Sequence, residues 1–303
     1  MKSVFVGAVE GSRVALDALV RAGRAPALVI TISPEQASRH SDFADLAPMA
    51  RAADSDVLFT SQINSASTVA ALRDVKPDLC MVIGWSQICK EEFRSVAKFG
   101  NIGFHPAPLP RFRGRAVIPW TILQNEKTSG SSLFWLDDGV DSGPIILQKM
   151  FALSPDETAQ SLYSKHSVNL AEMLPEAVRL VENGAAPRIV QNPSLATYCA
   201  KRTPDDGLID WRDTAENVLR FVRAVGYPYP GAFAFSGGEK IFIDLAMPFS
   251  GSTRYIGLTG QIQGDTDRGF LVRCGDGALV EVISWRWKFE SKPRVHSKLL
   301  GAY

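Results

Sequence analysis

The sequence has few cysteines, and none is placed for a metal site or a disulfide framework. Cys80, Cys89, Cys199 and Cys274 are the only four in 303 residues, and no two of them form a C-x-x-C pair. Zinc sites and disulfide scaffolds use paired or regularly spaced cysteines. We therefore expect four free thiols, buried as small apolar side chains.

Long apolar runs and an excess of either charge are also absent. No apolar stretch approaches the roughly 18–20 residues of a membrane span, and the apolar start of the chain is too short for a signal peptide because it soon reaches Glu10. The chain carries 33 basic and 32 acidic residues, a formal charge of +1. A balanced charge disfavours a surface that coats polyanions. These features predict a cytoplasmic enzyme that binds no membrane, and they disfavour nucleic acid as a partner.

The first part of the chain alternates short apolar runs with helical periodicity. The apolar runs lie at residues 3–8, 27–32 and 78–83, and helical spacing recurs between them and again at 158–181. This alternation predicts an α/β fold with a mostly parallel sheet. Ligands bind such sheets at the carboxyl ends of the strands, and the loop at 84–87 follows one of these ends.

The second part of the chain has a different pattern. After about residue 205, a helical stretch is followed by short β-rich runs at 232–235, 240–243, 260–262, 270–273 and 278–283. Several short strands at this spacing predict a small barrel or sandwich. Between the two parts lies a polar stretch at 184–194 that is typical of a linker. We assign domains to 1–190 and 205–303, joined by a linker at 191–204.

One histidine of four stands out as a candidate for chemistry. His105 follows a short apolar segment and precedes three prolines at 106, 108 and 110, which restrict the backbone and hold the ring in one place. Histidine is the side chain whose pKa lies nearest neutrality. The alternative is a histidine that hydrogen-bonds to the backbone at a strand end. His166, at core spacing in a helix, is interpreted as packing.

Three aspartates form the second candidate group. Asp137, Asp138 and Asp141 lie in a turn-rich loop between two strand candidates. Turn carboxylates are usually solvated, and Asp138 is interpreted so. Asp141 restarts a strand and can point inward at the sheet end, where it would orient a nearby histidine. The spacing does not establish that Asp141 meets His105. The histidines are isolated from other ligand types, so no metal is implied.

Four motifs follow one another along the chain: F-H-P-A-P-L-P-R-F-R-G-R at 104–115, L-D-D-G-V-D-S-G at 136–143, K-R-T-P-D-D-G-L-I-D-W at 201–211, and R-A-V with P-Y-P-G-A-F at 223–225 and 228–233. In this order they resemble the motifs of N10-formyltetrahydrofolate-dependent formyltransferases. The resemblance spans roughly residues 1–285. It implies a Rossmann-like formyltransferase domain with a mostly parallel sheet, followed by a small C-terminal β-rich, OB-like domain.

The resemblance implies an N-formyltransferase that uses N10-formyltetrahydrofolate as its co-substrate. The forms of the third and fourth motifs are closer to enzymes that formylate an amino sugar on a nucleotide carrier, and the near-neutral charge agrees. Methionyl-tRNA formyltransferase is the main alternative. A formyltransferase of a small hydroxylated amine, and a catalytically impaired protein that binds folate or a nucleotide sugar, also stay open, as does a homodimer.

The resemblance also implies roles for individual residues. His105 and Asp141 match the catalytic histidine and aspartate of the family. The pterin would contact two loops, whose residues are Trp85, Ser86, Gln87, Ile88, Asp137, Asp138, Gly139 and Val140. Arg115 would face a substrate phosphate, since guanidinium matches phosphate oxygens bidentately. Arg202, Tyr227 and Tyr229 would line the sugar-nucleotide side.

One position departs from the family pattern. The family has an asparagine two residues before the histidine, where this chain has Gly103. Asn101 lies two residues further away, about 13 Å from His105 along an extended chain, too far to replace it directly. Ser86 and Gln87 are candidates for the missing donor.

Overall fold

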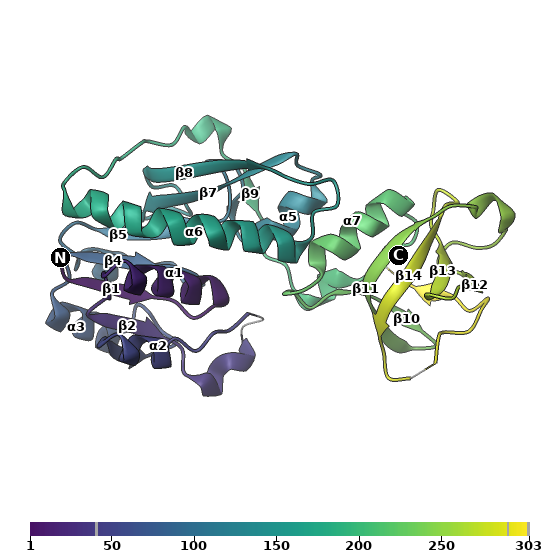
Figure 1. The fold of residues 1–303 in the computed structure, drawn as a ribbon, viewed down its shortest axis with the longest axis horizontal. Helices are drawn as coiled ribbons and strands as arrows, with labels where there is room; N and C mark the ends of the chain where they lie inside the picture. The colour runs from purple at the N-terminus through teal and green to yellow at the C-terminus, as the bar shows by residue number, and fades with distance from the viewer. Residues whose placement is uncertain (40–41, 290, 302–303) are drawn as a thin grey trace. The chain divides into compact units, whose positions relative to one another are not determined.

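The computed structural model describes residues 1–39, 42–289 and 291–301, which fall into two compact units (Figure 1). The first unit comprises Met1–Val117, Thr128–Ala152 and Tyr163–Ala200; the second comprises Ile118–Lys127, Leu153–Leu162 and the residues from Lys201 onward. The predicted domain limits of 1–190 and 205–303 stay a prediction.

The first unit is built on a seven-stranded sheet in the order β3-β2-β1-β4-β5-β7-β8. Its strands are β1 (Ser3–Val6), β2 (Leu28–Thr31), β3 (Asp56–Phe59), β4 (Leu79–Val82), β5 (Asn101–His105), β7 (Thr128–Trp135) and β8 (Ile145–Ala152). Strands β1 to β5 pair in parallel, whereas β7 runs antiparallel to both β5 and β8. The predicted mostly parallel α/β fold is confirmed. The sequence pattern did not predict strand β5, because Gly103 interrupts its apolar run.

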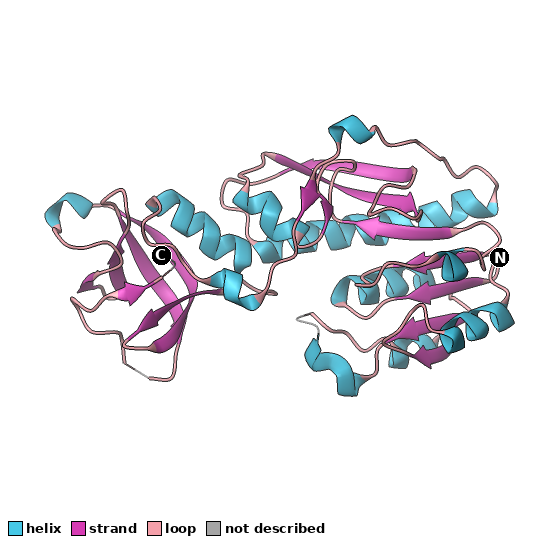
Figure 2. Cartoon of the chain, turned by 180° about the vertical axis from the view of Figure 1, so that it is seen from behind, coloured by secondary structure: helices cyan, strands magenta, loops and turns pink. Residues whose placement is uncertain are grey.

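Helices cover both faces of this sheet (Figure 2). Helices α1 (Glu10–Arg21), α2 (Ala47–Ala52) and α6 (Ala159–Glu182) bury residues such as Leu16 and Leu174 against Phe5 on one face. Helices α3 (Ala66–Val75) and α4 (Glu91–Arg94) pack on the other face, where β1 presents Val4 and Val6. Successive residues of β1 therefore point to opposite faces, and both faces are apolar, as burial on both sides of a parallel sheet requires.

Short elements complete the first unit. Strands β6 (Arg113–Gly114) and β9 (Tyr198–Cys199) pair in parallel, and this pairing ties the segment after His105 to the stretch that precedes the second unit. The 3₁₀ turns Pro34–Arg39 and Pro193–Leu195 also belong to this unit. The four cysteines are free, and Cys199 is only partly buried, unlike the buried thiol that we predicted.

The second unit contains a six-stranded antiparallel sheet in the order β12-β13-β14-β11-β10-β15. Its strands are β10 (Ala232–Ser236), β11 (Glu239–Phe249), β12 (Ile262–Asp265), β13 (Phe270–Arg273), β14 (Leu279–Arg286) and β15 (Leu299–Leu300); its helical elements include α5 (Val117–Leu123), α7 (Ala215–Val225) and the 3₁₀ turns Pro204–Gly207 and Ser252–Arg254. The predicted β-rich part is confirmed. Only the run predicted at 260–262 is misplaced, because the chain turns at Gly260, where φ is +75°, and the strand begins at Ile262. Among the residues that the structure describes, no helix is long and apolar enough to span a membrane.

Candidate active site

A cavity of about 540 Å³ lies at the carboxyl ends of β4 and β5, where open α/β sheets bind their ligands. Four segments of the first unit contribute most of its lining: 84–89, 103–105, 114–116 and 137–141 without residue 138. The cavity therefore brings together the two motifs that the sequence analysis singled out around His105 and Asp141.

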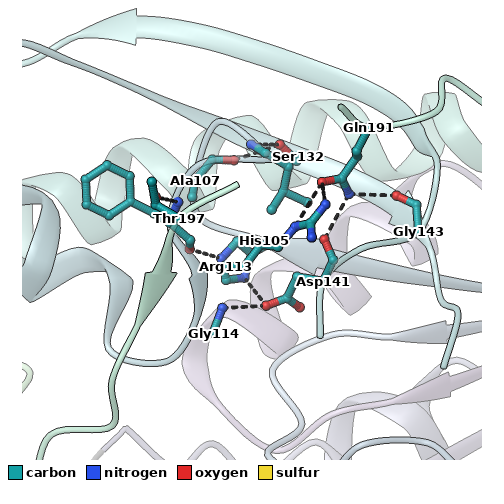
Figure 3. Close-up of polar contacts among 11 residues, drawn as sticks. His105, Ala107, Arg113, Gly114, Ser132, Asp141, Gly143, Gln191 and Thr197 are labelled. Atoms are coloured by element: carbon teal, nitrogen blue, oxygen red, sulfur yellow. Dashed lines mark hydrogen bonds and ion pairs between the residues drawn. The ribbon is translucent and has the colours of Figure 1, made fainter. Parts of the chain in front are cut away.

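His105 and Asp141 face one another in this cavity (Figure 3). His105 is the last residue of β5 and is 5% exposed, and its Nδ1 lies 3.5 Å from Asp141 Oδ2. On its other side, Nε2 donates to the carbonyl oxygen of Phe112 at 2.6 Å. Asp141 also accepts a hydrogen bond from the backbone N–H of Gly114 at 2.8 Å. Tertiary structure thus makes the contact that sequence spacing leaves open.

Both ring nitrogens of His105 face oxygen acceptors. A neutral imidazole carries one N–H and one lone pair, so in that state one nitrogen would set its lone pair against an oxygen. The doubly protonated ring satisfies both Phe112 and Asp141. The pair therefore places a group that can donate and accept protons beside the cavity, as acid–base catalysis requires.

Backbone strain concentrates around this pair. Phe112, Ala116 and Asp141 have φ values of +60°, +54° and +50°, in the left-handed region that costs non-glycine residues free energy and persists only where neighbours hold it. The Phe112 conformation directs its carbonyl at His105, and its N–H is held by Thr197 Oγ1 at 2.8 Å. The Asp141 conformation directs its carboxylate at the same ring.

Hydrogen bonds also fix the proline-rich loop after His105. Ser132, which lies opposite His105 on β7, donates to the carbonyl oxygen of Ala107 at 2.7 Å. Gln148 on β8 donates to Ser132 Oγ and to the carbonyl oxygen of Leu109, both at 2.9 Å. His105 therefore lies at the end of β5, and the loop that follows it is held by hydrogen bonds from β7 and β8.

Most of the predicted pterin-binding residues line the cavity. Trp85, Ser86, Gln87, Ile88, Asp137, Gly139 and Val140 do so, and Asp138 does not. The Asp137 carboxylate accepts from the N–H of Gly139 at 3.2 Å and from Ser142 Oγ, so it shapes the turn. The indole N–H of Trp85 is buried and has no hydrogen-bond partner among the described residues.

The structure narrows the search for the donor that replaces the family asparagine. Gly103 lines the cavity without a side chain. Asn101 is buried and donates to the carbonyl oxygen of Arg94 at 2.8 Å, and the carboxamide of Gln87 is committed to Ser61 and Ile63 of a neighbouring loop at 2.7 and 2.9 Å. These contacts hold the Gln87 carboxamide in place but use only one of its two N–H groups, so Gln87 and Ser86 both stay candidates.

The predicted substrate-binding residues fall into two groups. Arg115 lines the cavity, is exposed, and its guanidinium has no partner within the described parts of the chain. Arg202, Tyr227 and Tyr229 belong to the second unit, and their role stays a prediction. Within that unit, Arg202 stacks on Trp120 with 5.1 Å to the ring centroid.

His166 has the packing role that the sequence predicts. It is 2% exposed, its Nδ1 lies 2.8 Å from Ser131 Oγ, and its ring meets the edge of Phe151. Burial lowers the pKa of His166 to about 3. Within residues 1–39, 42–289 and 291–301, no cluster of three or more histidine, cysteine or carboxylate side chains is placed to hold a metal.

Comparison with known proteins decides the family. Residues 1–178 match the formyl transferase family, and residues 201–296 match the formyl transferase C-terminal domain. The chain belongs to the formyl transferase family. The predicted resemblance and the predicted enzyme class, an N-formyltransferase, are confirmed.

Relatives of this formyltransferase in sequence include methionyl-tRNA formyltransferases. The protein of that name from Anaeromyxobacter dehalogenans strain 2CP-C is 32% identical over 97% of this chain and 94% of the relative. The one from Syntrophus aciditrophicus strain SB is 32% identical over 91% of this chain and 88% of its own length.

Solved structures of other family members share the fold of this formyltransferase. WlaRD, a sugar 3N-formyltransferase crystallised with dTDP and 5-N-formyl-THF, has a TM-score of 0.67 at 16% identity, with 100% of this chain and 99% of that chain covered. HypX from Aquifex aeolicus, in complex with tetrahydrofolic acid, has a TM-score of 0.68 at 18% identity over 99% of this chain and 46% of that chain.

Proposed function

We propose that this formyltransferase transfers the formyl group of N10-formyltetrahydrofolate to the amine of a nucleotide-linked amino sugar. The folate half of the proposal rests on the family and on the cavity beside His105. Its volume of about 540 Å³ is in the range of small-molecule sites.

The observation that carries the acceptor half is the charge of the C-terminal part. Residues 201–303 contain 14 basic and 12 acidic side chains. Five of the basic side chains form ion pairs with carboxylates of the same unit: Arg212–Asp210, Arg220–Glu216, Arg268–Glu281, Arg286–Asp244 and Lys288–Glu239. A protein that binds a polynucleotide usually carries a clear excess of basic over acidic side chains for its phosphate contacts, and the excess here is only two. A small acceptor with one or two phosphates needs far fewer cations, and Arg115 at the cavity forms no ion pair with any residue that the structure describes.

The proposed reaction is an acyl transfer. The acceptor amine attacks the formyl carbon, the bond from that carbon to N10 breaks, the amine loses a proton and N10 gains one. The carbonyl oxygen is an oxyanion in between, and one well-placed donor stabilises such a charge by about 3–4 kcal/mol. Gly103 offers no side-chain donor, so the charge falls to His105 and to the other donors of the cavity wall.

The two contacts of His105 suggest how the ring divides its work. The bond from Nε2 to Phe112 is short at 2.6 Å, whereas Nδ1 is 3.5 Å from Asp141. The Nε2 side anchors the ring, and the looser Nδ1 side shares its proton between the carboxylate and the reacting group. Asp141 stabilises the positive ring and keeps its orientation.

The test is an assay with N10-formyltetrahydrofolate and two classes of acceptor. A panel of amino-sugar nucleotides and charged initiator tRNA are incubated in parallel, released tetrahydrofolate is followed by absorbance, and His105→Asn serves as the inactive control. Turnover with a sugar nucleotide that is lost in the variant supports the proposal. Formylation of the tRNA alone overturns the proposal. Folate binding without turnover of either class of acceptor also overturns it.

A second candidate function, formylation of methionyl-tRNA, is favoured by one observation. The relatives of that name match this chain at about 30–32% identity over nearly its whole length. For that function the rate should fall steeply with added salt, because counterions compete for phosphate contacts. A sugar nucleotide with few phosphates predicts a much weaker dependence.

A further inference from the structure

Gln191 lies in the stretch that the sequence predicts to be a linker, and yet it is buried. Its side-chain amide reaches the turn that carries Asp141 (Figure 3). Nε2 donates to the carbonyl oxygen of Asp141 at 2.8 Å and to that of Gly143 at 2.7 Å. The amide therefore holds the main chain on both sides of Ser142, next to the strained residue whose carboxylate faces His105.

The other end of the same amide is held by a buried arginine. Oε1 of Gln191 accepts from Arg113 at 2.7 Å (Nη2) and 3.2 Å (Nε). Arg113 is 4% exposed, and Nη1 donates to the hydroxyl of Tyr198 at 3.2 Å. Within the described residues, no carboxylate pairs with this guanidinium, so a buried charge is held by neutral acceptors alone. Such a charge is stable only when its hydrogen bonds are made, and this requirement keeps Gln191 in place.

Only an amide fits this position. It presents two N–H groups to two carbonyls and an oxygen to a guanidinium, whereas a carboxylate only accepts and an apolar side chain does neither. The chain of contacts runs from Arg113, through Gln191, to the backbone of Asp141. The backbone of Asp141 has a φ of +50°. A non-glycine residue keeps such a left-handed conformation only where its surroundings enforce it.

We propose that Gln191, locked by Arg113, is a positioning residue that holds Asp141 in the left-handed conformation in which its carboxylate faces His105. The inference rests on the roles proposed above for His105 and Asp141, and it is independent of which acceptor the enzyme uses. Neither Gln191 nor Arg113 needs to touch a substrate.

The test uses two isosteric substitutions whose electrostatic effects differ. Gln191→Met keeps the charge around the site and removes all hydrogen bonds of the amide. Gln191→Glu keeps the bonds from Arg113, neutralises its charge and removes both donors. Positioning predicts that both variants lower kcat, by about 10²-fold for a displacement near 1 Å, with little change in KM for the folate. The pH profile of kcat is expected to move toward that of Asp141→Asn in both.

Control variants distinguish a loss of positioning from a change of charge, from misfolding and from a failure of the proposed catalytic roles. Gln263→Glu changes a buried glutamine of the second unit, 7% exposed, and is expected to keep the wild-type rate. Arg113→Lys keeps the charge and loses the forked contact; it supplies a milder variant with the same expected direction if Gln191→Met does not fold. An effect in Gln191→Glu alone would assign the change to charge and overturn the inference. Wild-type pH profiles in both variants would also overturn it, provided that His105→Asn is inactive. An active His105→Asn would instead refute the proposed catalytic roles.

Discussion

Leu136 occupies the space into which a side chain at Gly103 would extend. A β-carbon on Gly103 would lie 2.6 Å from Leu136 Cδ2 and 3.0 Å from the ring of Phe134. Both neighbours line the cavity, so its wall is apolar where the family pattern places an amide. The departure at this position is therefore accommodated by the packing around it and is not a simple deletion of one side chain.

Gly103→Asn is expected to destabilise the protein without raising its activity. The new side chain collides with Leu136, and overpacking of this kind costs about 1–3 kcal/mol. Urea unfolding measures the loss, and Gly103→Asn combined with Leu136→Ala should recover most of it. The matched control is Gly264→Asn, also at a strand glycine without a positive φ, where the nearest atom to the would-be β-carbon is Tyr255 Cε1 at 3.7 Å, an ordinary contact distance. A single variant as stable as that control would show that Leu136 yields easily.

His105→Asn and Asp141→Asn are each expected to lower kcat by about 10²–10⁴-fold, the usual contribution of a positioned acid or base. Asparagine at 141 still accepts from the N–H of Gly114, so the fold and folate binding should persist. Single-turnover kinetics and a folate titration measure the two properties separately. Asp138→Asn is the control, because residue 138 is not part of the cavity lining; a comparable loss there would argue against the assignment.

His166 makes the stability of the protein depend on pH. Burial lowers the pKa of His166 to about 3 in the folded state, against about 6.5 for an exposed histidine. Between these values the unfolded chain binds a proton that the folded chain does not, so stability falls as pH falls below about 6.5. The loss attributable to this residue is about 2 kcal/mol at pH 5.

Unfolding in urea at pH 7.5 and pH 5 measures this dependence. His166→Leu removes the titrating group and loses the bond to Ser131, so the variant should be less stable at pH 7.5 but lose less stability on acidification. The other histidines are common to both proteins. The difference between the two proteins in how much the free energy of unfolding changes from pH 7.5 to pH 5 therefore reports on His166. An equal change in both proteins would mean that burial does not lower the pKa of His166.

Arg202→Ala is expected to lower the stability of the second unit, whatever the role of Arg202 toward substrate. Its guanidinium lies 5.1 Å from the ring centroid of Trp120 and 5.8 Å from that of Phe221, and it donates to the carbonyl oxygen of Asp206 at 2.5 Å. Loss of such stacking costs about 1–2 kcal/mol. Thermal unfolding measures the change against Arg254→Ala, an exposed arginine. A rise in KM for the acceptor at unchanged stability would instead support the predicted substrate contact alone.

The sequence by itself determined the fold class and the two loops that meet at the site. Alternating apolar runs are local patterns, and they identify β1, β2 and β4 because burial on both faces requires apolar residues throughout. The motifs around His105 and Asp141 identified the family for the same reason, since each is contiguous. Only the tertiary structure decided the long-range contacts around the site. Gln87 hydrogen-bonds to Ser61 and Ile63, Leu136 fills the space beside Gly103, and Gln191 reaches the turn of Asp141 from a stretch predicted as a linker. These are contacts between segments far apart in the chain, and their partners are chosen by three-dimensional packing, for which no local spacing encodes a signal.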